Sequence, residues 1–113
     1  MITPEIKYPL EYLNVPDSDE EEDFFVSVTA AIGPKEEEGA DLFYLYIVSP
    51  MRLEKMGKTK GLIQGKDKFI LNKFSRELVE QELSNIIIRC KRNTWEETAQ
   101  ALNRFLFWEY DKR

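Results

Sequence analysis

The fold is decided by the stretch from Phe24 to Val48, FFVSVTAAIGPKEEEGADLFYLYIV. Its first part, Phe24–Ile32, alternates apolar residues along one face with a mixed opposite face, as on a half-buried strand. Its last part, Leu42–Val48, is apolar on both faces, which predicts a central strand covered on both sides. Between them lies a charged, glycine-bounded loop in which Gly33-Pro34 indicates a turn. The stretch therefore predicts an antiparallel hairpin whose loop, longer than usual, projects from the sheet.

The residues on the N-terminal side predict one more strand. Ile6, Tyr8, Leu10 and Tyr12 are spaced by two, and Pro9 lies inside this run. Because proline cannot donate to a sheet ladder, the pattern indicates an edge strand. The acidic run of residues 17–23 is too charged to bury and predicts a solvated loop.

On the C-terminal side, Ser49-Pro50 is a typical helix start, with serine as N-cap and proline at the first helical position. We expect a short helix over Met51–Met56 that Gly57 ends. A glycine-rich loop follows over residues 57–65. Lys68–Leu71 then predicts a short third strand of the hairpin sheet.

Two further helices are expected near the C-terminus. Ser75 can cap a long helix that runs through Cys90, and Thr94-Trp95-Glu96-Glu97 has the form of a capping box. The expected apolar stripe of the first helix consists of Leu78, Val79, Leu83, Ile86, Ile87 and Cys90. The stripe of the second consists of Trp95, Thr98, Ala99, Leu102 and Leu106.

Strands therefore come first and helices last, which is typical of an α+β fold. We expect one domain over residues 1–113, built as an antiparallel β-sheet with two longer C-terminal helices packed on one face. The other face of the sheet is expected to be partly open to solvent.

Composition excludes several classes of function. The chain of 113 residues carries a net charge of −5 and no histidine, which argues against a general binder of nucleic acid or anionic membranes and against most hydrolytic and metal chemistry. Its one cysteine, Cys90, cannot form an internal disulfide and is expected to be buried as a small apolar residue. With no signal peptide or membrane span indicated, we expect a cytoplasmic protein that is not an enzyme and needs no cofactor.

Charge is unevenly distributed along the chain. Residues 17–41 contain ten acidic residues and one lysine, whereas residues 52–76 contain eight basic and two acidic residues. An acidic run is often only a solvated surface, but it also speeds association with a basic protein, such as a nuclease. The candidate binding residues are Asp17, Asp19, Glu20, Glu21, Glu22, Asp23, Glu36, Glu37, Glu38 and Asp41.

A metal site is not expected among these acids. The spacing of Asp17, Asp19 and Glu21 is similar to the first half of a calcium loop. The glycine and the glutamate that such a loop needs at its sixth and twelfth positions are replaced by Glu22 and Val28.

Five segments stand out, in this order along the chain: Ala31-Ile32-Gly33-Pro34, Val48-Ser49-Pro50, Gly61-Leu62-Ile63-Gln64-Gly65, Thr94-Trp95-Glu96-Glu97 and Trp108-Glu109-Tyr110. Together they resemble the Immunity protein 8 family of bacterial polymorphic-toxin systems. The resemblance runs from about Phe24 to Asp111, although the chain ends soon after Tyr110 without the acidic-aromatic tail of some relatives. It implies a cytosolic antidote that binds and blocks a cognate toxin. It supplies no motif of functional residues, so these segments are interpreted as markers of the fold.

The leading hypothesis is therefore an immunity protein that occludes a toxin, steered by its acidic segments. The toxin class, and binding at its active site or at an exosite, stay open. The alternative is a non-catalytic adaptor or a self-associating module, and the sequence leaves monomer and homodimer open. A small enzyme or ligand binder is the third hypothesis, for which no constellation of residues is found.

Overall fold

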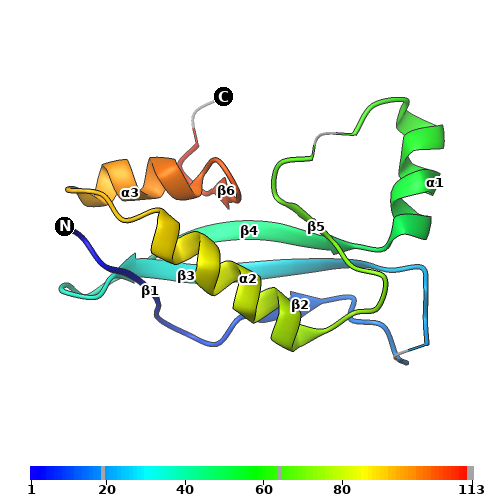
Figure 1. The fold of residues 1–113 in the computed structure, drawn as a ribbon, viewed down its shortest axis with the longest axis horizontal. Coiled ribbons are helices and arrows are strands. Elements are labelled where there is room, and N and C mark those ends of the chain that lie inside the picture. The colour runs from blue at the N-terminus through cyan, green and yellow to red at the C-terminus, as the bar shows by residue number, and fades with distance from the viewer. Residues whose placement is uncertain (19, 64, 112–113) are drawn as a thin grey trace.

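The computed structural model describes residues 1–18, 20–63 and 65–111 and shows an α+β fold (Figure 1). The elements, in chain order, are β1 Pro4–Ile6, β2 Glu11–Leu13, β3 Phe25–Pro34, β4 Asp41–Val48, α1 Pro50–Lys60, β5 Lys68–Ile70, α2 Arg76–Arg89, α3 Trp95–Leu102 and β6 Phe107–Trp108. The predicted class, an antiparallel sheet with two C-terminal helices on one face, is confirmed, and the one parallel pairing among the described strands is that of β5 with β4.

The sheet is built around the predicted hairpin of β3 and β4. These strands pair antiparallel, with Phe25 opposite Val48 and Ile32 opposite Asp41. On the outer side of β3 lie β1 and β2, both antiparallel to it. On the outer side of β4 lie β6, which is antiparallel, and β5, which is parallel. The parallel pairing follows from the connection, since the chain leaves β4, passes through α1 and returns to enter β5 in the same direction.

The N-terminal strand was expected to be continuous, and it is divided. Pro4–Ile6 and Glu11–Leu13 form separate short strands on the edge of β3, with Pro9 between them. The edge position was correctly predicted. The break was not predicted, and its chemical cause is that Pro9 has no N–H to donate to the ladder.

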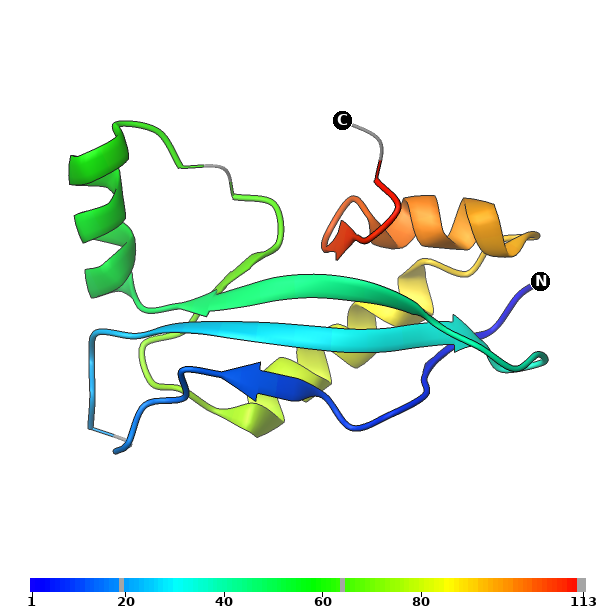
Figure 2. The same ribbon diagram turned by 180° about the vertical axis from the view of Figure 1, so that it is seen from behind.

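The core lies between the sheet and α2. The predicted face of β3, from Phe24 to Ile32, is buried in full. Figure 1 shows α2 crossing this face, and Figure 2 shows the opposite face of β3 and β4 with no helix over it. The expectation that β4 is covered on both sides is therefore wrong, because Tyr44 and Tyr46 are half-buried and Leu42 is exposed.

Local signals located the helix starts better than the helix ends. Ser49, Ser75 and Thr94 are the N-caps as predicted, and each accepts a hydrogen bond from a backbone N–H three residues on. In contrast, α1 continues through Gly57 and ends at Gly61, whose φ of 74° is the left-handed conformation that suits glycine.

The C-terminal segment also differs from expectation. The last helix ends at Leu102, and Leu106 is buried from the turns that follow it. Beyond it Phe107 and Trp108 form β6. Leu78, placed on the apolar stripe of α2, is half-exposed.

Gly33 and Pro34 end β3, and the turn follows them: the carbonyl of Pro34 accepts a hydrogen bond from the backbone N–H of Glu37 at 3.2 Å. Gly33 is required there by a close approach of the backbone, since a Cβ atom would lie 2.1 Å from the carbonyl oxygen of Gly39.

Candidate functional site

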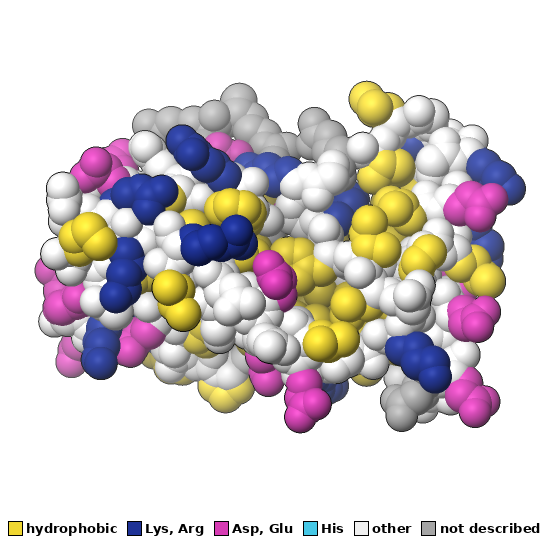
Figure 3. Space-filling model, in the orientation of Figure 1, with side chains coloured by type: hydrophobic (Ala, Val, Ile, Leu, Met, Phe, Trp, Pro, Cys, Tyr) yellow, Lys and Arg dark blue, Asp and Glu magenta, His cyan; other side chains and the backbone are white. Residues whose placement is uncertain are grey.

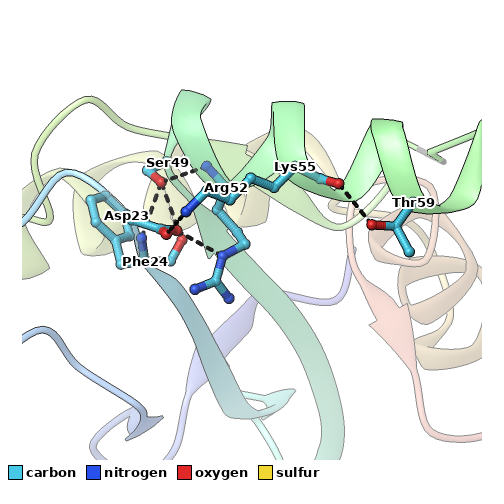
Figure 4. Close-up of polar contacts among 6 residues, drawn as sticks. All are labelled: Asp23, Phe24, Ser49, Arg52, Lys55 and Thr59. Carbon is cyan, nitrogen blue, oxygen red and sulfur yellow. Dashed lines mark hydrogen bonds and ion pairs between the residues drawn. The ribbon is translucent and has the colours of Figure 1, made fainter.

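The acidic run before β3 is anchored at its last residue. Asp23 accepts hydrogen bonds from Arg52 Nε at 2.7 Å and from Lys55 Nζ at 2.5 Å, both on α1 (Figure 4). The hydrogen bond from Lys55, and then that from Arg52, holds the pKa of the Asp23 carboxyl below its ordinary value. Part of the predicted segregation of charge is thus neutralised within the chain, where the acidic run meets the basic one.

A buried serine fixes the same junction. Ser49 Oγ accepts from the backbone N–H of Arg52 at 3.1 Å and from that of Phe24 at 3.0 Å. It also lies 3.4 Å from the carbonyl oxygen of Phe24, to which it donates. Figure 4 shows this oxygen between the first turn of α1 and the chain entering β3. One hydroxyl therefore caps α1 and also fixes the backbone of Phe24, where the acidic run ends.

Between Pro16 and Asp23 the acidic side chains that the structure describes face solvent. Asp17, Glu20, Glu21 and Glu22 are exposed, and their carboxylates have no hydrogen-bond or ion-pair partner among the residues that the structure describes. Asp19 lies outside the described residues. The run thus presents free carboxylates from a segment that Asp23 ties to α1.

The second acidic segment belongs partly to the fold. Glu36 Oε1 accepts from the backbone N–H of Thr3 at 2.9 Å, and this bond lowers the pKa of the Glu36 carboxyl. Asp41 Oδ2 accepts from two indole N–H groups, Trp95 Nε1 at 2.9 Å and Trp108 Nε1 at 3.0 Å. Of this segment's candidate acids, Glu37 and Glu38 have exposed side chains with no partner among the described residues.

The two acidic segments lie at opposite ends of the molecule. They flank β3, whose ten residues span about 30 Å at the usual rise of a strand. Figures 1 and 2 show the hairpin turn at one end of the long axis and the chain before β3 at the other. The structure therefore does not bring the candidate residues into one negative surface, but offers two separate acidic ends.

A groove on the helical side was not found from the sequence. It has a volume of about 570 Å³ and runs between β5, α2 and the turn after α3. Figure 3 faces this side and shows apolar side chains gathering there. Its lining includes Ile70, Leu78 and Phe105, three apolar residues that remain exposed. We refer to this hollow as the β5–α2 groove.

The rim of the β5–α2 groove is mainly basic. Lys66, Lys68, Arg89 and Arg104 line it, against Asp67 and Glu82. Arg89 lies over the ring of Phe105, with Cζ 5.1 Å from its centroid, and pairs with Glu82 at 3.8 Å. The available sequence signals were Leu78, which lies next to the buried Val79 at the margin of the stripe, and the basic excess of residues 52–76.

The described residues offer neither a cluster of metal ligands nor an activated thiol. No group of three or more histidine, cysteine, aspartate or glutamate side chains within them could hold a metal ion. Burial raises the pKa of the Cys90 thiol, which opposes formation of a reactive thiolate. The burial predicted for Cys90 is confirmed.

None of the helices in the described part of the chain is long and apolar enough to cross a membrane.

The sequence profile of the Immunity protein 8 family matches residues 10–112. No curated protein and no solved structure matches the chain. The match covers both acidic segments, the hairpin and the C-terminal helices, and it agrees with the segments singled out in the sequence. The chain therefore belongs to the Immunity protein 8 family.

Proposed function

We propose that this protein binds a cognate bacterial toxin and blocks it, protecting the cell that makes both. The observation that carries the proposal is the family match over residues 10–112. The toxin would be a contact-delivered or secreted effector of a polymorphic-toxin system, and the immunity protein would act in the cytoplasm. Its action would be stoichiometric occlusion of the toxin and not catalysis.

Electrostatic steering by the acidic ends would speed formation of the complex. Glu20, Glu21 and Glu22 are exposed on a segment tied to α1 through Asp23, so their charges are held near one end of the sheet. A basic toxin, such as a nuclease, would be attracted to this end over a distance set by the ionic strength. Glu37 and Glu38 supply a second, separate acidic end.

The function is tested by co-expression with the product of the gene immediately upstream. We expect the two proteins to copurify, and growth inhibited by the upstream product to be restored. If the upstream product is not toxic and does not bind, the proposal is wrong. Sedimentation would then test a self-associating module, which the half-buried Tyr44 and Tyr46 on the open sheet face favour.

Charge reversal of the first acidic run tests the steering. Replacing Glu20, Glu21 and Glu22 by lysine should slow association with the toxin at low salt by about tenfold or more. The dissociation rate should change little, since exposed charges act mainly before contact. Stopped-flow association at low and high salt measures both effects. The double variant Glu37→Lys/Glu38→Lys tests the other end separately, and equal rates in all three proteins would refute steering.

A further inference from the structure

The outer edge of β5 is open. This strand pairs with β4 on one side, and no other strand among the described residues joins it. The carbonyl of Asp67 and the N–H of Leu71 are directed at β4, where they bond Tyr46 and Val48. Because successive residues of a strand direct their backbone groups to alternate sides, Lys68 and Ile70 direct theirs outward.

These outward groups are partly available for a partner. The N–H of Lys68 bonds the carbonyl of Gly65 at 3.3 Å. The N–H of Ile70 and the carbonyls of Lys68 and Ile70 have no backbone partner within the described ranges. An edge of this kind is a ready template for another strand.

The β5–α2 groove lies along this edge and offers both apolar and charged contacts. Its lining runs from Gly65 to Leu71 on the strand side and from Leu78 to Arg89 on α2. Arg104 stands on the rim, and its guanidinium has no hydrogen-bond or ion-pair partner in the described part of the chain. Arg89 lies over the ring of Phe105, and its one ion pair among the described residues is with the exposed Glu82 at 3.8 Å.

We propose that the β5–α2 groove receives an extended segment of the toxin, which adds as a strand to the outer edge of β5. This inference rests on the proposed function and assigns it a contact surface. The segment's backbone bonds the free groups of Lys68 and Ile70. Apolar side chains at alternate positions enter the groove against Leu78 and Phe105. A carboxylate on the segment meets Arg104 and Arg89, which complements the basic rim.

Two variants with matched controls test the inference in the complex of the full chain with the toxin. Ile70→Pro removes the outward N–H without touching the β4 ladder, whereas Ile70→Ala keeps that N–H. Arg104→Glu reverses a rim charge, whereas Lys60→Glu makes the same change in charge on exposed α1, outside the groove. We expect Kd to rise about tenfold for Ile70→Pro and for Arg104→Glu. It should stay within about twofold for Lys60→Glu. Ile70→Ala trims a side chain of the groove but keeps the N–H, so it should raise Kd less than Ile70→Pro does.

Amide exchange gives a readout specific to strand addition. In the free protein the Ile70 amide should exchange fast, and in the wild-type complex it should become protected. Unchanged Ile70 exchange, or normal binding by both Ile70→Pro and Arg104→Glu, overturns the inference while leaving the immunity function intact. If the wild-type protein does not bind the toxin at all, the proposed immunity function is wrong. The proposal that a toxin segment occupies the groove is then wrong as well.

Discussion

Asp41 holds the C-terminal segment against the sheet through a single oxygen atom. Its Oδ2 receives the indole N–H of Trp95 from α3 and that of Trp108 from β6. Both rings also pack near Phe43, edge-on for Trp95 and stacked for Trp108. The segment interpreted from the sequence as a helix cap therefore has a second role, since the indole N–H of Trp95 donates to Asp41 at the start of β4.

Removing this acceptor should destabilise the fold. Asp41→Ala leaves two part-buried indole N–H groups without their partner, so the free energy of unfolding should fall by about 2–3 kcal/mol. Asp41→Asn keeps an acceptor oxygen but loses the charge that strengthens both bonds, so about 1 kcal/mol should be lost. Urea denaturation measures both values. Asp17→Ala is the control, and equal stability of Asp41→Ala and Asp17→Ala would show that the two bonds contribute nothing.

At the scale of elements, helix starts depend on local chemistry and sheet edges depend on distant residues. The three N-caps could be predicted because a serine or threonine hydroxyl bonds N–H groups within the next turn. The short strand β6 could not be predicted from the sequence, because Phe107 and Trp108 become a strand only by pairing with Tyr44 and Phe43. The groove was missed for the same reason, since it needs β5, α2 and the turn at Phe105 together.

The capping serine of α1, Ser49, should contribute more to the free energy of unfolding than an ordinary N-cap does. Ser49→Ala loses the N-cap and leaves the buried N–H of Phe24 without an acceptor, so it should cost about 2–4 kcal/mol. Thr94→Ala loses a cap on an exposed helix start and should cost about 1 kcal/mol. Thermal and urea unfolding compare the two variants. A loss for Ser49→Ala no greater than that for Thr94→Ala would contradict the double role of this hydroxyl.

At the scale of the whole molecule, acidic charge gathers at the two ends of the sheet. The sequence predicted which residues carry it, but only the length of β3 shows that the two segments cannot act as one patch. The sequence alone also could not show that Asp23, Glu36 and Asp41 have hydrogen-bond partners inside the fold, because those partners lie far away in the chain. Whether these acids contact a toxin stays a prediction.

The internal partners of Asp23 and Glu36 predict a dependence of stability on pH. The pKa values of both carboxyls lie below their ordinary values of 3.8 and 4.5 in the folded chain. Their stabilisation is therefore complete above these ordinary values and is lost as pH falls through the lowered ones. Asp23→Asn should consequently lose less stability than wild type between about pH 5 and about pH 3.

Denaturation in urea across this range measures the effect. Glu38→Gln is the matched control, since its carboxylate is exposed and without a partner in the described residues. If Asp23→Asn and wild type give parallel curves, the ion pairs of Asp23 with α1 have no influence on acid stability.

The shared carboxylate of Asp41 has a spectroscopic consequence. The chain has two tryptophans, and both indoles are bound at this one oxygen atom. Intrinsic fluorescence excited in the indole band therefore reports on a single seam, where α3 and β6 meet the start of β4. Circular dichroism instead averages over every helix and strand. Comparing the two signals during unfolding thus reveals, without any added label, whether this seam opens before the rest of the protein.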